Sequence, residues 1–499
     1  MNRLNTIWRR GAVSSCLAAL LVISSSCSTN PATGKSQVAL ISEQQEIAMG
    51  KEADQQIQQQ LGLYPDQELQ AYVNRVGQKL AADSERPNLP WTFRVVDDPV
   101  VNAFALPGGF IYVTRGLLTH LTSEAELASV IGHEIGHVTA RHSVEQMSKA
   151  QLAQIGLIAG MILKPELAQQ YGNLAQQGLQ LLFLKYGRDD ERQADGLGLR
   201  YINRENYDPR EMPPVFATLQ RVSAQQQRQA GGGQGRIPNW LSTHPSEEER
   251  IRTISGEVAK IGGDFSNRTV NREGYMKALD NVVFGQNPRE GYFVGNTFIQ
   301  PDLGIQIRFP EGWKGSNQKD AVGAMSPNQD AIVVMTLSGQ GSPQQAAQQF
   351  FAQQGVQAGQ TFRTDLGGLP AVARSFGVQT QQGELQGIAA FVESNNKVYQ
   401  LLGYTTAQNW RRYGDAISGA LGSFEKVTDR RALDVQPKRV DVVSLASAMT
   451  LDEFARRYPS TVDMETLAII NQADSNTRFP AGAEVKRVVG GELPTERGR

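Results

Sequence analysis

The spacing of hydrophobic residues changes twice along this 499-residue chain, and these changes limit the folds that it can adopt. Residues 40–265 place apolar residues mainly at helical spacing, with a few short strand-like runs. Residues 290–430 contain several strand-like runs, and residues 439–490 follow a strand–helix–helix–strand order. The chain is also too long for one ordinary hydrophobic core. It therefore predicts an α+β multidomain protein: a mainly helical domain with a short β-sheet, a small α+β sheet module and a βααβ unit.

The first 26 residues have the pattern of a secretion signal. Three arginines precede an apolar run that is shorter than the ~20 residues of a membrane-spanning helix. Cys16 and Cys27 are the two cysteines of the chain, and a cut before Cys27 would leave only one, so no internal disulfide could form. We predict a signal peptide over residues 1–26 and a polar tether over residues 27–39.

The stretch that ends at Cys27 resembles a bacterial lipoprotein box, although Ser24 stands where leucine or valine is commoner. This resemblance implies lipidation of Cys27 and attachment to a membrane. Because serine rather than aspartate follows the cysteine, it implies a periplasmic protein anchored to the outer membrane. The alternative is an ordinary cleaved secretion signal.

The charge balance gives no sign of a polyanionic partner. Lys and Arg number 49, Asp and Glu number 50, and the formal net charge is -1, with no basic block. We therefore expect no nucleic acid among the partners of this protein.

The stretch VIGHEIGHVTARH, residues 130–142, carries three of the five histidines. His133 and His137 are four residues apart, so a helix places them on one face, one turn apart. Two imidazoles in this arrangement can bind one ion, and Glu134, rotated by about 100° from His133, can take a proton from water on that ion. The stretch is the H-E-x-x-H pattern of zinc peptidases. The alternative is a helix with two surface histidines and a salt-bridging glutamate.

A catalytic zinc needs a third protein ligand. Glu191 and Asp195, in the stretch 186–199, stand at positions i and i+4 and would share one face of a helix. Glu191 could bind the ion while Asp195 accepts the N–H of a liganding histidine. His142 is turned by about 140° from His137, and we do not expect it to be a ligand. Taken alone, the stretch 186–199 would be an acidic surface helix.

These motifs together resemble a known family. The H-E-x-x-H stretch, the Glu-x-x-x-Asp stretch and the preceding NAFALPGG (102–109) are similar to the HtpX and CAAX-prenyl-protease type of gluzincin metallopeptidases. The similarity covers about residues 30–260 and includes YDPREMPPVFATLQR (207–221) and STHPSEEERI (242–251). The chain resembles the periplasmic lipoprotein branch of this family, to which the β-barrel assembly-enhancing proteases belong. It implies one Zn²⁺ per chain and the following roles: His133, His137 and Glu191 as ligands, Glu134 as general base, and Asp195 as partner of a liganding histidine.

His244, in a Thr-His-Pro stretch, is implied by the same resemblance to lie beside the zinc. There it would cap the ion or assist catalysis, and the residues alone leave that role open. The strand-like stretch Asn102, Ala103, Phe104 and Ala105 is predicted to be an edge strand that pairs with an extended peptide substrate. The alternative for this stretch is a buried structural strand.

Two further segments carry predictions of their own. Residues 151–184 are apolar, but their longest uninterrupted apolar run is too short to span a bilayer. They predict an amphipathic helical hairpin or a lid over the cleft. Residues 439–490 resemble a LysM module, a glycan-binding fold, but Ala448 and Met449 replace its usual Gly-Asp pair. We predict a structural version of that fold, with peptidoglycan binding as the alternative. The similar positions are Leu451, Phe454, Ala455, Leu467, Ile470, Asn471, Pro480 and Gly482.

The function predicted from these features is that of a zinc-dependent endopeptidase of the bacterial cell envelope. By resemblance, its substrates are misfolded or stalled periplasmic and outer-membrane polypeptides. Two alternatives stay open: a non-catalytic chaperone or assembly scaffold that keeps the ion for structure, and a cell-wall-binding protein that acts through its C-terminal unit. Residues 290–430 carry no histidine, no cysteine and no motif with an evident chemistry.

Overall fold

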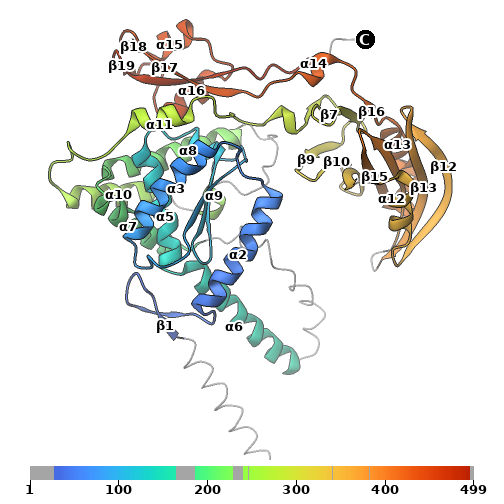
Figure 1. Cartoon of the computed structure of the whole chain (residues 1–499). Helices are drawn as coiled ribbons and strands as arrows, with labels where there is room; N and C mark the ends of the chain where they lie inside the picture. Colours follow the sequence, from blue (N-terminus) through green and yellow to red (C-terminus); the bar gives the residue numbers. More distant parts are fainter. Residues whose placement is uncertain are drawn as a thin grey trace, which may run out of the picture. The chain divides into compact units, whose positions relative to one another are not determined.

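A computed structural model describes residues 27–163, 186–228, 240–244, 247–339, 341–380 and 383–494. The protein is multidomain and mixes helices with sheets, which confirms this part of the prediction. It divides into two compact units (Figure 1). Unit 1 runs through Val282 and takes in Asp441–Arg487, and unit 2 comprises Val283–Val440 and Val488–Arg499. The predicted signal peptide and most of the predicted lid lie outside the described residues.

Helix α5 (Glu124–Thr139) is the central element of unit 1. Every residue from Ala125 to Thr139 is buried, so this helix has no solvent face over that length. Helix α7 (Arg188–Arg204) packs closely on it because glycines line the contact. A Cβ on Gly136 would lie 2.9 Å from the carbonyl oxygen of Ala194, which is closer than real Cβ atoms come to other atoms. This close approach brings the acidic residues of α7 to the histidines of α5.

A three-stranded sheet lies beside α5, in the order β3-β5-β4. Strand β3 (Thr92–Val96) runs parallel to β5 (Phe110–Thr114), and β4 (Ala103–Leu106) runs antiparallel to β5. The turn between β4 and β5 contains Gly108 and Gly109, whose φ angles are 80° and 99°. Residues with side chains rarely adopt such angles, so glycine permits this tight return.

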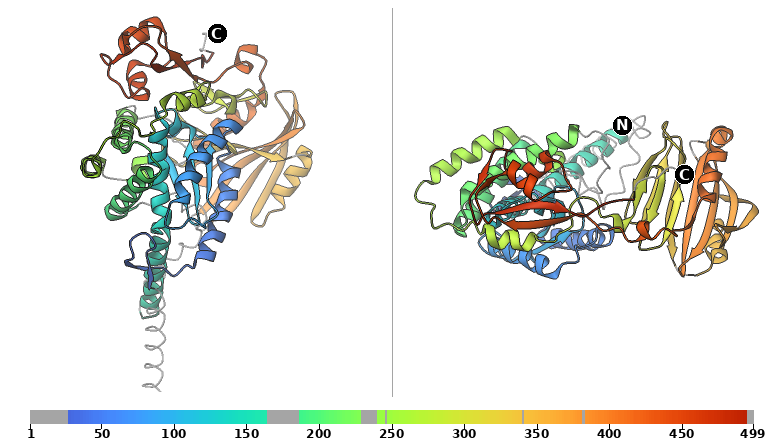
Figure 2. Two further views of the ribbon diagram at one scale, coloured as in Figure 1. Left: turned by 60° about the vertical axis from the view of Figure 1, so that its left-hand side comes forward. Right: turned by 90° about the horizontal axis from the view of Figure 1, so that it is seen from above.

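Most of the remaining helices of unit 1 lie around this centre, whereas the helix of residues 142–163 extends away from it (Figures 1 and 2). Among the described residues, no helix combines the length and apolar character that crossing a bilayer requires. The helices are α2 (Glu43–Gln60), α3 (Gln67–Ala82), α4 (Arg115–Leu118), α6 (His142–Leu163), α8 (Met212–Arg228), α9 (Trp240–Thr243), α10 (Glu247–Ile261) and α11 (Arg272–Leu279).

The segment predicted as a tether forms a small hairpin of β1 (Cys27–Thr29) and β2 (Ser36–Val38). The buried Asn30 donates a hydrogen bond of 3.0 Å to the carbonyl of Ala140, at the C-terminal end of α5. A local polar pattern could not predict this contact, because its acceptor lies 110 residues away.

Residues 441–487 belong to unit 1 and have the predicted order of elements. Strands β17 and β20 pair, and β18 pairs with β19 around the two short helices. The order fits the predicted βααβ unit, while its resemblance to a glycan-binding module stays a prediction. The elements are β17 (Arg439–Ser444), β18 (Met449–Thr450), α15 (Leu451–Arg457), α16 (Met464–Ile470), β19 (Arg478–Phe479) and β20 (Glu484–Val489).

Unit 2 contains a seven-stranded antiparallel sheet in the order β12-β13-β14-β15-β11-β10-β9 and a four-stranded sheet in the order β16-β8-β7-β6. Its strands alternate buried and less buried residues, as expected when a face packs on a core. The main elements are β6 (Tyr292–Val294), β7 (Thr297–Gln300), β8 (Ile305–Arg308), β9 (Lys314–Asn317), β10 (Ala321–Met325), β11 (Ala331–Gly339), α12 (Pro343–Phe351), β12 (Val356–Leu366), β13 (Leu369–Thr380), β14 (Gly383–Ser394), β15 (Lys397–Thr406), α13 (Trp410–Gly422), β16 (Glu425–Lys426) and α14 (Arg430–Leu433).

Candidate metal centre

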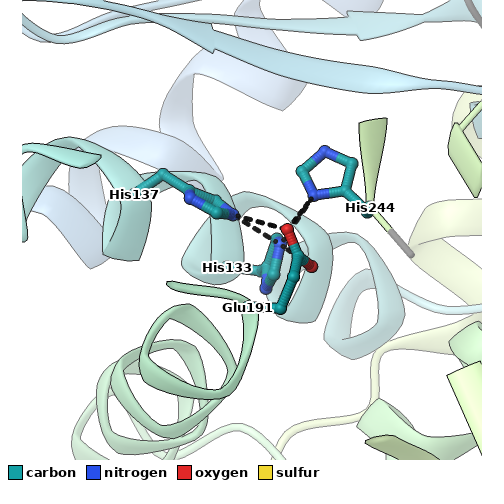
Figure 3. Close-up of side chains that lie close together, drawn as sticks. All are labelled: His133, His137, Glu191 and His244. Carbon is teal, nitrogen blue, oxygen red and sulfur yellow. Dashed lines mark hydrogen bonds and ion pairs between the residues drawn. The ribbon is translucent and has the colours of Figure 1, made fainter. Parts of the chain in front are cut away.

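Four side chains from three segments of unit 1 converge on one point (Figure 3). His133 and His137 come from α5, Glu191 from α7, and His244 from the residue that follows α9. All four are buried, and each offers one donor atom that lies within 4.8 Å of the others. The structure thus brings together the three predicted ligands and the histidine whose role was left open.

The distances between these donor atoms suit one small ion. His133 Nε2 lies 3.0 Å from His137 Nε2 and 3.3 Å from His244 Nδ1. Glu191 Oε1 lies 2.9 Å from His244 Nδ1 and 3.5 Å from His137 Nε2. Donors at about 2.0–2.1 Å from a tetrahedral zinc lie about 3.3 Å from one another. The four residues therefore fit a transition-metal ion without a large rearrangement.

Asp195 and Arg250 lie directly behind the cluster. Asp195 Oδ1 is 2.9 Å from His133 Nδ1, the ring nitrogen that points away from the cluster. The buried guanidinium of Arg250 donates two hydrogen bonds, of 2.8 and 2.7 Å, to the Asp195 carboxylate. A third nitrogen, Nη1, lies 2.7 Å from Glu191 Oε2. Arg250 therefore connects a candidate ligand with the carboxylate that orients His133.

The electrostatics of the cluster favour a neutral His137 and ionised carboxylates at Glu191 and Asp195. Burial alone would lower the pKa of His244, but the carboxylates of Glu191 and Glu134 outweigh it and raise that pKa. Burial lowers the pKa of His137 well below its usual value, and the positive charge of neighbouring histidines lowers it further. Burial alone would raise the pKa of Glu191, but the charge and hydrogen bond of His244 and the charges of His133 and Arg250 outweigh it and lower that pKa. Burial would likewise raise the pKa of Asp195, but the charge and hydrogen bonds of Arg250 and His133 outweigh burial and lower that pKa to about 2. Neutral imidazoles and ionised carboxylates are the forms that bind a metal.

Glu134 is fully buried beside the cluster, and neither of its carboxylate oxygens has a hydrogen-bond partner. Burial raises its pKa, partly offset by the charges of His244 and His133. His244 Nε2 lies 3.6 Å from Glu134 Oε1, which is too long for a good hydrogen bond. A buried carboxylate without a partner is costly. Its position next to the four donor atoms keeps Glu134 as the candidate general base.

Three further side chains, which the sequence patterns do not predict as site residues, contact members of the cluster. Arg250 lies within a stretch that carries the family resemblance, but no spacing of motif residues marks it as a partner of the ligands. The ring of Tyr186 stacks on His137 with centroids 3.8 Å apart, and the ring of Trp240 stacks on His244 at 4.0 Å. No periodic pattern singles out these rings, because their place depends on how distant segments pack.

His142 is not among the four converging residues, and that it is no ligand stays a prediction. Its Nδ1 is 2.9 Å from His137 Nδ1, the nitrogen that faces away from the other donor atoms. Its Nε2 is 2.6 Å from the side-chain oxygen of Gln193. His142 therefore supports the orientation of the His137 ring and cannot reach the shared point at the same time.

The predicted substrate strand lies close to α5. Asn102 is buried and precedes β4, which carries Ala103, Phe104 and Ala105 and is an edge strand of its sheet. All four residues of β4 are buried, so the strand also serves as a structural element of unit 1. The backbone of Cys27 belongs to β1, and its side chain lies outside the described part of the structure.

The comparison with known families agrees with this geometry. Residues 67–258 match the model described as Peptidase family M48.

The chain carries an M48 peptidase domain.

This match confirms the metallopeptidase resemblance drawn from the two motifs. All residues of the cluster lie within the M48 domain, on α5, on α7 and next to α9. The family depends on a metal, and the buried cluster of histidines and glutamate fits that requirement.

Curated relatives carry names of the same kind. The chain is 36% identical over 191 residues to the mitochondrial metalloendopeptidase OMA1 of Arabidopsis thaliana, which covers 38% of this chain and 36% of that protein. It is 35% identical over 202 residues to a putative beta-barrel assembly-enhancing protease of Vibrio cholerae. This alignment covers 39% of this chain and 40% of that protein. The chain is 34% identical over 186 residues to OMA1 of Schizosaccharomyces pombe, covering 37% and 51%. The chain thus spans about half, or less, of the length of these relatives.

Proposed function

We propose that this protein is a zinc-dependent endopeptidase that hydrolyses polypeptides in the bacterial cell envelope. The observation that carries the proposal is the convergence of His133, His137 and Glu191 beside a buried Glu134 whose carboxylate oxygens accept no hydrogen bond from the described residues. A structural ion would not require a carboxylate left without a hydrogen bond at this position. The M48 match and the names of the relatives support the same activity.

The residues of the centre divide the work of peptide hydrolysis. A zinc ion held by His133, His137 and Glu191 would polarise the scissile carbonyl and lower the pKa of water. Glu134 takes the proton from the attacking water and passes it to the leaving amine. Its raised pKa suits the first of these steps, because a carboxylate with a higher pKa takes a proton from water more readily.

The surrounding residues position this machinery. Asp195 accepts the Nδ1 proton of His133, so that Nε2 keeps its lone pair for the ion. His244, between Glu191 and Glu134, is placed either to cap the ion or to support the negative charge of the reacting carbonyl oxygen. Strand β4 would offer the backbone of residues 102–105 to an extended substrate, which favours broad rather than sequence-specific cleavage.

The substrates and location follow from the relatives and from the N-terminal sequence. We propose misfolded or stalled periplasmic and outer-membrane proteins as substrates, since some relatives are named for β-barrel assembly. Lipidation of Cys27 would hold the protein at the outer membrane on its periplasmic side. Peptidoglycan binding by residues 439–490 would be a separate activity.

The decisive experiment combines metal analysis with cleavage of unfolded casein by the full chain. We expect about one zinc per chain, cleavage that chelation abolishes and zinc restores, and a Glu134→Gln variant that keeps the zinc but loses cleavage. Glu249→Gln, an exposed change on α10, is the matched control and should cleave normally. Zinc binding without casein cleavage by the wild type would refute the proposal and favour a scaffold that keeps zinc for structure. Full cleavage by Glu134→Gln would exclude Glu134 as the general base.

A further inference from the structure

Three consecutive backbone carbonyls just before helix α5, which carries His133 and His137, accept hydrogen bonds from residues about 350 positions later in the chain. The carbonyls belong to Thr119, His120 and Leu121, in the short link between α4 and α5. Lys486 Nζ donates to the first at 2.9 Å and to the third at 2.6 Å. Gln472 Nε2 donates to the second at 3.3 Å. Both donors belong to the 441–487 segment of unit 1.

The same amide also reaches the first turn of α5. Gln472 Nε2 donates a 2.9 Å hydrogen bond to Glu126 Oε2. This buried carboxylate also accepts from the backbone N–H of Thr122 at 2.6 Å and from its hydroxyl at 3.1 Å. Glu126 therefore joins the link, the helix and the C-terminal segment. His133 lies seven residues further along, about two helical turns away on the same side of α5.

Lys486 is fully buried, which is rare for a lysine. Burial lowers the pKa of its ammonium and raises that of the Glu126 carboxyl, while the two opposite charges counteract both shifts. An ammonium withdrawn from water destabilises the fold unless strong acceptors surround it. The two carbonyls of the link supply these acceptors, so the position of the link and the burial of Lys486 depend on each other.

The backbone around Lys486 is itself fixed. Asn471, which is buried at the end of α16, accepts from the backbone N–H of Lys486 and donates to its carbonyl, both at 2.8 Å. The same amide donates to the carbonyl of Leu467 at 2.9 Å. The contact between strand β20 and helix α16 therefore fixes the backbone of Lys486, from which the side chain extends to the link.

A second contact leads to the metal centre through α8. Arg221 donates to the carbonyl of Ala473 at 3.0 Å, and Gln225 donates to the hydroxyl of Thr466 at 2.9 Å. Helix α8 also carries Phe216, whose ring centroid lies 4.4 Å from the guanidinium carbon of Arg250 and 6.3 Å from the His133 ring. The C-terminal segment thus contacts both α5, which carries two candidate ligands, and α8, which packs near one of them.

We infer that residues 441–487 act as a built-in clamp of the peptidase, in which Lys486 and Gln472 are positioning residues for the start of the metal helix. The clamp holds the 119–121 link and the first turn of α5, and so fixes the register of His133 and His137 relative to α7. The inference concerns the protein's own helix and rests on the proposed function only where cleavage is the readout. It predicts that the C-terminal unit cannot be removed as a separate binding module.

Hydrogen exchange of the full-length chain, followed by mass spectrometry, tests the clamp without relying on cleavage. Lys486→Met keeps the length of the side chain but removes the ammonium, and Gln472→Leu removes the amide. We expect amides of residues 119–127 to exchange about tenfold faster in both variants, while those of α3 keep their rates. Zinc affinity, measured by competition with a chelator, should fall in parallel, since the ligands lose their fixed spacing.

Arg478→Met is the matched control. Arg478 also lies in the 441–487 segment, but its side chain is exposed and its contacts, with Ala448 and Glu453, stay within that segment. It should leave exchange at 119–127 and zinc affinity unchanged. If Lys486→Met prevents folding, Gln472→Leu decides alone. Unchanged exchange at 119–127 in a folded Lys486→Met or Gln472→Leu variant would overturn the clamp, whether or not the protein proves to be a protease.

Discussion

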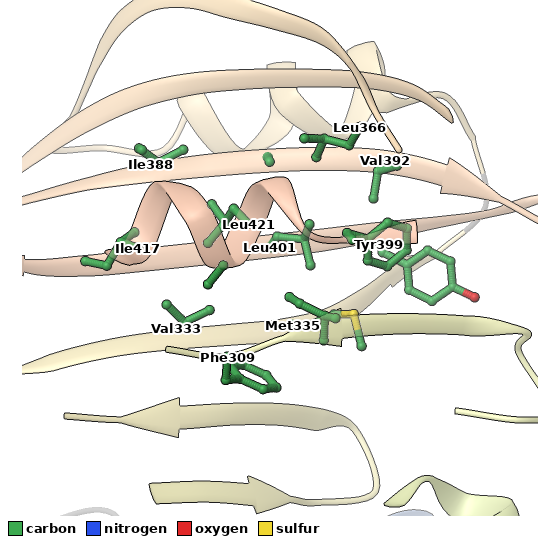
Figure 4. Packing of buried hydrophobic residues seen from close by; sticks show 14 of the residues in the cluster. Phe309, Val333, Met335, Leu366, Ile388, Val392, Tyr399, Leu401, Ile417 and Leu421 are labelled. Atoms are coloured by element: carbon green, nitrogen blue, oxygen red, sulfur yellow. The ribbon is translucent and has the colours of Figure 1, made fainter. Parts of the chain in front are cut away.

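The interiors of the two units differ in the chemical character of their buried side chains. Unit 1 buries charged or titratable side chains at its centre, among them Arg86, Glu126, Glu134, Arg250 and Lys486. In the described part of residues 283–440, the buried polar side chains are Ser326, Ser394 and Thr405, and none of the buried residues there is charged. The core of that unit is formed by aliphatic and aromatic side chains such as those in Figure 4.

This difference shows where the sequence was shaped by chemistry rather than by stability alone. Burying charge destabilises a fold unless each group finds its partners, whereas burying apolar surface stabilises it directly. Unit 1 accepts that cost around the metal centre and at both ends of α5. At the C-terminal end of this helix, Arg86 joins the Val138 carbonyl to Glu46, and at its N-terminal end Lys486 and Gln472 hold the preceding link.

The largest expected effect tests the chemistry of unit 1. Glu191→Gln keeps the shape of a candidate ligand but removes its charge, so we expect the zinc content to fall to background and cleavage to drop by about 10³-fold or more. Metal analysis and casein cleavage measure these losses. Normal zinc content in this variant would exclude Glu191 as a ligand.

The second prediction concerns the apolar core of unit 2. Leu401 is fully buried on β15, and Leu401→Ala should destabilise unit 2 by about 2–5 kcal/mol, because it removes apolar contacts and leaves a cavity. Denaturant unfolding measures the change, and cleavage per folded molecule should stay the same. The control is Leu337→Ala, since Leu337 is 50% exposed and should cost little. A large loss of zinc affinity in folded Leu401→Ala would break the contrast between the units.

A smaller effect is expected at Arg250, which binds both Asp195 and Glu191. Arg250→Met keeps the buried stem of the side chain but removes the cation, and zinc affinity should weaken about 10–100-fold. Competition with a chelator measures this change. Arg252→Met, at an exposed position of the same helix, should leave the affinity unchanged.

The smallest effect is a pH dependence that only unit 1 should show through histidine, because unit 2 contains none. Burial, helped by the charge of Lys486, lowers the pKa of His120 to about 4. An unfolded histidine titrates near about 6.5, so the unfolded state binds more protons in between and stability is lost as the pH falls from about 6.5 to about 4. His120→Gln should reduce this slope by up to about 1.4 kcal/mol per pH unit. Thermal unfolding of wild type and variant across this range would show it, and identical slopes would contradict it.

The sequence by itself predicted those features that depend on local periodicity. A spacing of four residues places His133 over His137, and Glu191 over Asp195, in any helix that forms there. The change from helical to strand-like patterns likewise indicated a multidomain mixture of helices and sheets, which the structure confirms. The predicted roles of the site residues, zinc as the ion and the lipid on Cys27 stay predictions.

Only the tertiary structure decided which distant groups reach these local patterns. It brought His244 and Arg250 to the histidines of α5, and it placed Lys486 under a link about 350 residues earlier in the chain. Helical periodicity is fixed by backbone hydrogen bonds between near neighbours, so a sequence displays it openly. Contacts between remote segments depend on how whole helices pack. Glycines such as Gly136 allow α5 and α7 to approach closely, but the sequence around them shows no periodic pattern that predicts this contact.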